Sequence, residues 1–78
     1  MSVQPTILRN DSNMISVRNG CGQILHFSYK TLVCLEEPTG TRFRTSKFWS
    51  RTTSKHIGKF GCAGGEAVEQ NVLEGMVK

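Results

Sequence analysis

Apolar and polar residues alternate with a period of two along much of the first half of the chain, which is typical of half-buried strands. The alternation marks three segments: residues 14–18, 23–29 and 41–45. Between them, residues 31–35 are apolar or β-branched throughout, as in a strand buried on both faces. Asn19-Gly20 and Pro38-Thr39-Gly40 supply turn residues between these segments. The pattern predicts an antiparallel meander of three or four strands.

The period changes after residue 50. Over residues 52–60, Lys55 and Lys59 fall on one side of a helix and Ile57 on the other. A threonine or serine hydroxyl among residues 52–54 is expected to cap the helix N-terminus. Gly61 is expected to take the left-handed conformation just past the C-terminus. We therefore predict one short amphipathic helix after the meander.

The two ends of the chain carry weaker signals. Residues 1–12 are polar and contain a proline, so they are expected to form a loose arm or an edge strand. Residues 66–70 are interpreted as a short strand and residues 71–78 as a helical turn. At 78 residues the chain is predicted to be a single domain, residues 1–78. The predicted fold class is α+β, with an SH3-like barrel as the alternative architecture.

Positive charge is concentrated in one stretch of the sequence. Of ten lysine and arginine residues, six follow one another with no acidic residue between them: Arg42, Arg44, Lys47, Arg51, Lys55 and Lys59. They divide into a strand pair, a connector pair and a helix pair, so we expect a folded basic face that binds an anionic partner. Trp49 lies in the same stretch and is either an interface contact or a core residue.

The sequence offers little for catalysis or cofactor binding. Its three cysteines are widely spaced and no export signal is visible, which favours reduced thiols in a cytoplasmic protein. Cys21, Cys34 and Cys62 match no zinc-binding spacing with His26 or His56. The glycine pairs lack the lysine of a phosphate-binding loop. We expect no enzyme activity, no catalytic residues, no metal and no cofactor, and no apolar run is long enough to span a membrane.

Two segments of the chain resemble a family of small phage-type proteins without an assigned function. The matching residues are Phe27-Ser28-Tyr29-Lys30-Thr31 and Trp49-Ser50-Arg51-Thr52-Thr53-Ser54-Lys55-His56-Ile57, in the pattern F-S-Y-x-T followed by W-S-x-T-T-S-K-H-I. The chain departs from the pattern at Leu32, Cys34 and Gly58, where Pro, Ala and Asn are frequent. The resemblance implies an accessory protein of a phage or other mobile element, acting in the host cytoplasm.

Three functions are consistent with these observations. The first is a stoichiometric binder and inhibitor of host machinery, with anti-CRISPR activity as its most concrete version. The second is a nucleic-acid-binding module in which the same basic side chains contact phosphate. The third is a structural or assembly protein. The expected partner is a host protein or nucleoprotein complex, with direct nucleic-acid binding as the alternative and no membrane involved.

Overall fold

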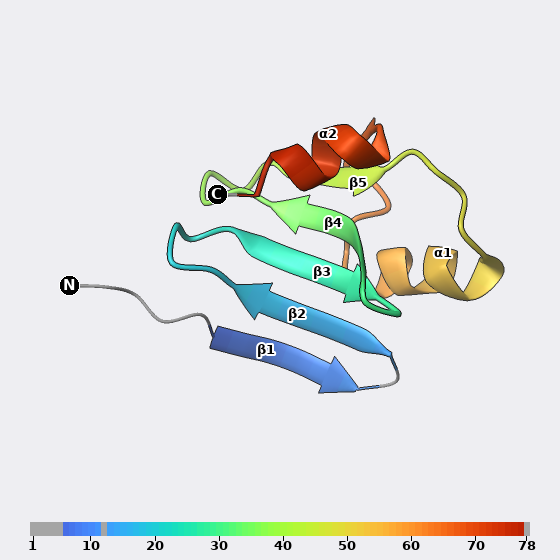
Figure 1. The fold of residues 1–78 in the computed structure, drawn as a ribbon, viewed down its shortest axis with the longest axis horizontal. Helices are drawn as coiled ribbons and strands as arrows, with labels where there is room; N and C mark the ends of the chain where they lie inside the picture. The colour runs from blue at the N-terminus through green and yellow to red at the C-terminus, as the bar shows by residue number, and fades with distance from the viewer. Residues whose placement is uncertain (1–5, 12, 78) are drawn as a thin grey trace.

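The computed structural model describes residues 6–11 and 13–77, which form one six-stranded sheet with two short helices (Figure 1). The strands are β1 (Thr6–Asp11), β2 (Met14–Arg18), β3 (Ile24–Ser28), β4 (Thr31–Glu36), β5 (Arg42–Thr45) and β6 (Glu66–Val68). The helices are α1 (Arg51–Lys59) and α2 (Gln70–Gly75). Strand order follows the sequence from β1 at one edge to β6 at the other. Only β5 and β6 run parallel, because α1 connects them and returns the chain.

The α+β class is confirmed, but the expected number of strands was too low. The meander corresponds to β2 through β5, and the short C-terminal strand and helical turn correspond to β6 and α2. The N-terminal segment forms the edge strand β1 over Thr6–Asp11, while residues 1–5 and 12 lie outside the described part of the chain. The open strand order does not confirm the SH3-like alternative. In the described residues, neither helix is long and apolar enough to cross a membrane.

The β2–β3 hairpin does not use the tight Asn19-Gly20 turn that was expected. The side chain of Asn19 accepts two backbone hydrogen bonds at 3.0 Å within a longer loop, where the positive φ belongs to Gly22, at 84°. The tight two-residue turn lies instead between β3 and β4, where Tyr29 and Lys30 have φ of 51° and 70°. Such a turn normally uses asparagine or glycine, whereas here two bulky residues hold the left-handed conformation.

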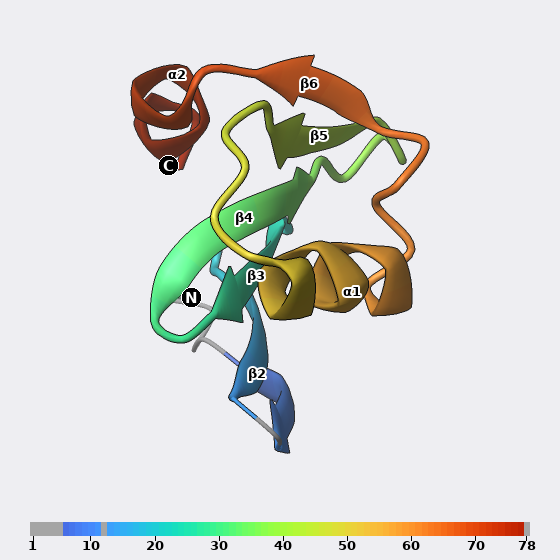
Figure 2. The same cartoon turned by 90° about the vertical axis from the view of Figure 1, so that its right-hand side faces the viewer.

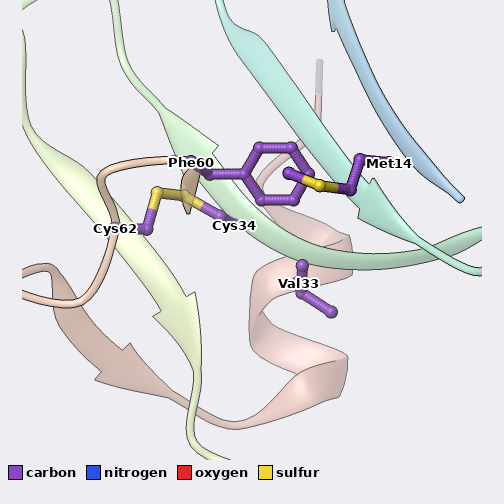
Figure 3. Close-up of a cluster of buried hydrophobic side chains, with 5 residues drawn as sticks. All are labelled: Met14, Val33, Cys34, Phe60 and Cys62. Atoms are coloured by element: carbon purple, nitrogen blue, oxygen red, sulfur yellow. A yellow bond between two sulfur atoms is a disulfide. The ribbon is translucent and has the colours of Figure 1, made fainter. Parts of the chain in front are cut away.

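The two helices lie on opposite faces of the sheet (Figure 2). One cluster of apolar side chains packs beneath each helix. The cluster on the α2 face consists of Leu25, Leu32, Leu35 and Leu73. The cluster on the α1 face consists of Met14, Val33, Cys34, Phe60 and Cys62 (Figure 3). A β-bulge in β4 produces this division, because His26 pairs with Cys34 while the next residue of β3 pairs with Leu32. The prediction that this strand is buried on both faces is confirmed.

The cysteines differ from the sequence-based expectation. Cys34 and Cys62 form a disulfide in the α1-side cluster, with Cα atoms 6.3 Å apart, whereas Cys21 is free and exposed (Figure 3). The prediction of three reduced thiols is therefore wrong for this pair. The two residues are 28 positions apart. They meet only because the chain turns back towards β4 after α1, which spacing alone could not indicate.

Candidate functional site

Helix α1 begins one residue earlier than predicted because a different hydroxyl caps it. Ser50 is the N-cap, and its Oγ accepts a hydrogen bond from the backbone N–H of Thr53 at 3.0 Å. None of residues 52–54 takes this role. Gly61 follows the helix with a φ of 78°, as predicted for its C-terminus. These two ends fix which side chains of α1 face the sheet and which face solvent.

The buried side of α1 is attached to β3 through polar side chains. The Ser28 hydroxyl lies 2.7 Å from Nδ1 of His56 and 3.1 Å from the Thr53 hydroxyl, and all three residues are buried. The Tyr29 ring lies 5.7 Å from the His56 ring, which supports its strained turn. All four residues belong to the two segments that resemble the phage-type pattern. That pattern therefore describes the contact between this helix and its strand.

The exposed side of α1 carries three of the predicted partner-binding residues in one row. Arg51, Lys55 and Lys59 are all exposed and four residues apart, so each lies about 6 Å along the axis and about 40° around it from the last. The row is therefore about 12 Å long. The helix contains no acidic residue. We call Arg51, Lys55 and Lys59 the basic row.

Strand β5 directs Arg42 and Arg44 towards the same face of the sheet but leaves neither fully available. The Nε of Arg42 donates to Glu36 at 2.8 Å, and its Nη1 donates to the carbonyl of Gly61 at 2.8 Å. Its charge is thus used to hold the segment that follows α1. Arg44 is half-buried and lines a shallow cavity of about 180 Å³ next to Ser54 of α1.

Lys47 and Trp49 lie on the connection between β5 and α1, which precedes the basic row. The Nζ of Lys47 lies 4.0 Å from the centroid of the Trp49 ring, a cation–π contact. Trp49 is 40% exposed and lines a cavity of about 480 Å³ with Leu25 and Phe27, which face α2. Trp49 is therefore not a core residue, and its ring faces a different cavity from the one that Arg44 lines.

Sequence reasoning missed a chain of buried polar groups near the C-terminal end of α1. The register places Ser16 opposite His26. The Ser16 hydroxyl lies 2.6 Å from Nδ1 of His26, and Nε2 lies 2.8 Å from Glu36. A carboxylate can only accept, so Nε2–H donates to Glu36 and Nδ1 accepts from Ser16. This order resembles a catalytic triad, but Ser16 is only 4% exposed, which leaves a substrate little access. The alternation of residues in β2 and β3 was the signal that could have placed Ser16 and His26 on the same face of the sheet.

The electrostatics of this chain favour a neutral imidazole beside an ionised carboxylate. Burial lowers the pKa of His26, although its hydrogen bond to Glu36 acts in the opposite direction. Burial alone would raise the pKa of Glu36, but hydrogen bonds from His26 and Arg42 outweigh it and the pKa is lowered. The contact between His26 and Glu36 is therefore a hydrogen bond near neutral pH, and Arg42 supplies the balancing charge.

A protein-family model described as a family of unknown function (DUF8033) matches residues 1–75. The chain belongs to this family. The match includes β1 to β6, α1 and α2, and so covers both the basic row and the polar chain behind it. No curated protein and no solved structure matches the chain. Membership confirms the resemblance at the level of a family without assigned function, and the phage context stays a prediction.

Proposed function

We propose that this protein is a small, non-catalytic module that docks on an acidic surface of a partner protein through Arg51, Lys55 and Lys59. The observation that carries the proposal is the basic row itself, three exposed cations on a helix without acidic residues. The opposite side of the helix is attached to β3 through buried hydrogen bonds. Charges held in a fixed geometry favour fast and specific association with a complementary surface.

Two features favour a protein partner over single-stranded nucleic acid. Trp49, the side chain best suited to stack on a base, lines a cavity with Leu25 and Phe27, which face α2. The row is also short, and three cations can neutralise only about three phosphates. Because phosphate contacts supply most of the non-specific affinity for nucleic acid, so few contacts support only weak binding.

The resemblance to phage-type proteins supports a host protein as the partner. Inhibition of host defence machinery, as by an anti-CRISPR protein, is the most specific form of the proposal. A stoichiometric inhibitor needs a rigid surface that covers a site on its target and does not need chemistry of its own. An 8.7 kDa domain with a basic row on a packed helix meets that requirement.

The test compares charge variants in affinity capture from nuclease-treated host lysate. Lys55→Glu reverses the centre of the row, and Lys30→Glu makes the same change on the exposed β3–β4 turn. We expect wild type and Lys30→Glu to retain one host protein that Lys55→Glu loses, and the purified pair to co-elute at equal stoichiometry in size-exclusion chromatography. Equal retention by Lys55→Glu would contradict the proposal.

Contact with duplex phosphate is the second candidate, favoured by the regular spacing of the same three side chains. Three phosphate contacts predict a salt slope of about −2.7, or roughly a 40-fold loss of affinity between about 50 and 200 mM salt. Fluorescence anisotropy with a labelled duplex measures this slope. No binding at the lower salt concentration would remove this candidate. Binding with the expected slope, together with no captured protein, would replace the protein partner with nucleic acid.

A further inference from the structure

Three metal-binding side chains converge in the α1-side cluster, apart from the basic row. A ring nitrogen of His26 and the sulfurs of Cys34 and Cys62 lie within 4.8 Å of one another. All three residues are buried, with His26 only 6% exposed and the cysteines not at all. Each comes from a different segment: His26 from β3, Cys34 from β4 and Cys62 from the chain after α1. Figure 3 shows the two cysteines. The cluster therefore exists only in the folded chain.

The β-bulge in β4 creates this convergence. Regular pairing continued from Phe27 and Leu32 would place Val33 opposite His26, whereas the register shift places Cys34 there. Val33 and Cys34 then both lie in the α1-side cluster, where Cys62 meets them. One additional residue in the strand thus makes a histidine and a cysteine cross-strand neighbours.

We propose that the reduced chain binds one thiolate-preferring metal ion, Zn²⁺ or Cu⁺, through His26, Cys34 and Cys62. Thiolate and imidazole are the ligands that both ions prefer. Zinc–sulfur bonds of about 2.3 Å in tetrahedral geometry place two sulfurs about 3.8 Å apart. The three ligand atoms lie within 4.8 Å of one another, and two of them are the sulfurs of the disulfide. These sulfurs separate after reduction, so coordination requires shifts on the order of 1–2 Å.

The surroundings of His26 suit a metal ligand. Ser16 and Glu36 each contact one of its nitrogens, so the ion replaces one hydrogen bond and the other keeps the ring oriented. The Phe60 ring, with its centroid 4.5 Å from that of His26, covers the imidazole. His26 also lines a cavity of about 210 Å³ with Ser16 and Glu36, which brings this side of the site close to solvent, whereas the two cysteines do not line it. The arrangement supplies both the ligands and the outer contacts that a metal site requires.

Binding requires the thiols and therefore excludes the disulfide form. Each thiol loses its proton when its sulfur becomes a ligand, so one bound ion releases two protons. The oxidised pair has no thiol to offer. The ion would join β3, β4 and the end of α1, so it would replace the link that the disulfide makes in the oxidised chain. This inference does not rest on the proposed function, because the basic row takes no part in it.

The test uses the full chain, reduced with a phosphine and kept free of oxygen. Titration with Co²⁺ is expected to give a thiolate-to-cobalt charge-transfer band that saturates at about one equivalent. Zn²⁺ and Cu⁺ are then added separately as competitors, and the ion that displaces cobalt at the lower concentration is the metal that the site prefers. Absence of a saturable band, together with no binding of Zn²⁺ or Cu⁺ in equilibrium dialysis, would overturn the proposal.

Variants separate the three ligands from adventitious binding. We expect Cys34→Ser, Cys62→Ser and His26→Gln to weaken binding by more than about 100-fold, the upper range for loss of an outer contact alone. Cys21→Ser removes the free, exposed cysteine and should leave binding unchanged. The oxidised wild type, which contains no substitution, should not bind. Binding by the oxidised chain, undiminished binding by all three ligand variants, or loss in Cys21→Ser would each overturn the proposal.

Discussion

Reduction of the Cys34–Cys62 disulfide is expected to lower the free energy of unfolding by about 3.6 kcal/mol. The disulfide joins β4 to the segment after α1, and both residues are fully buried. The two thiols can stay in the same cluster after reduction, so packing of the folded state changes little. The main change is in the unfolded chain, which regains the freedom that a closed loop denies it.

The magnitude follows from the separation of 28 residues between the two cysteines. A closed loop of that length removes about 12 cal/mol/K of chain entropy, which corresponds to about 3.6 kcal/mol at 25 °C. Domains of this size have a total stability of about 4–12 kcal/mol. Reduction should therefore remove about 30% or more of the total stability and lower the Tm by roughly 14–29 °C.

Urea unfolding followed by circular dichroism measures this change. The measurement is made on Cys21→Ser, which prevents thiol exchange, and in a chelator, which prevents metal from restoring the link. Addition of a phosphine should shift the midpoint, whereas a variant carrying both Cys34→Ala and Cys62→Ala should not respond to it. A loss below about 1 kcal/mol in the disulfide-containing chain would refute the entropy argument.

Three further predictions concern other parts of the fold. Gly58→Ala should raise the free energy of unfolding by about 1 kcal/mol, because a Cβ there meets nothing within 4 Å inside α1. Gly65→Ala should lower the free energy of unfolding, because the added Cβ meets two backbone carbonyl oxygens at 3.1 Å. Urea unfolding measures both variants, and shifts of the same sign would contradict this reasoning. Ser28→Ala should cost about 1–3 kcal/mol by chemical denaturation, because it removes a hydrogen-bond partner from buried His56; a neutral result would show that the contact contributes little. The pKa of Glu36 is lower in the folded chain than its unfolded value of 4.5. The stability contributed by this carboxylate is therefore fully present above pH 4.5 and is lost as the pH falls through the folded pKa. The free energy of unfolding should fall with acid below about pH 4.5. Glu36→Gln should flatten the pH profile in that range, and an unchanged profile would exclude this carboxylate as the cause.

Periodicity located the elements in which apolar and polar residues alternate, although β3 buries side chains on both of its faces. β2, β3, β5 and α1 each have an apolar and a polar face, so their positions could be predicted from alternation or from helical spacing. β1 has no such signal, because all six of its residues are exposed and only its pairing with β2 holds it in the sheet. An edge strand without a buried face has the same polar sequence pattern as a loose arm, so the pattern could not distinguish the two alternatives.

The candidate site was only partly predictable from the sequence. The position of a charged residue can be inferred from spacing, but whether its charge is already paired within the fold cannot. Helical spacing alone indicated that Lys55 and Lys59 share an exposed side. Nothing in the spacing of Arg42 indicates that it donates to Glu36 and to a backbone carbonyl. Nothing in the sequence position of Trp49 indicates that it lines a cavity with Leu25 and Phe27, which face α2. Long-range packing decides which cations remain free to bind.

The metal-binding cluster was hidden for a more local reason. A strand reverses the face of every later side chain when one residue is inserted, so face assignments from alternation fail beyond a bulge. β4 is apolar on both faces, and its sequence gives no mark of where the register shifts. Cys34 could therefore be placed in a buried strand but not opposite His26.

The attachments of α1 connect the stability of this fold to its proposed binding surface. The middle of the helix is held at Thr53 and His56 by the hydrogen bonds of Ser28. The segment after the helix is held by the disulfide and by Arg42. The basic row lies on the solvent side of the same helix, so its geometry depends on both attachments. Reduction without metal should loosen the C-terminal attachment while the Ser28 contacts remain. The position of Lys59 should then vary more than that of Arg51, and partner affinity should fall although no contact residue has changed.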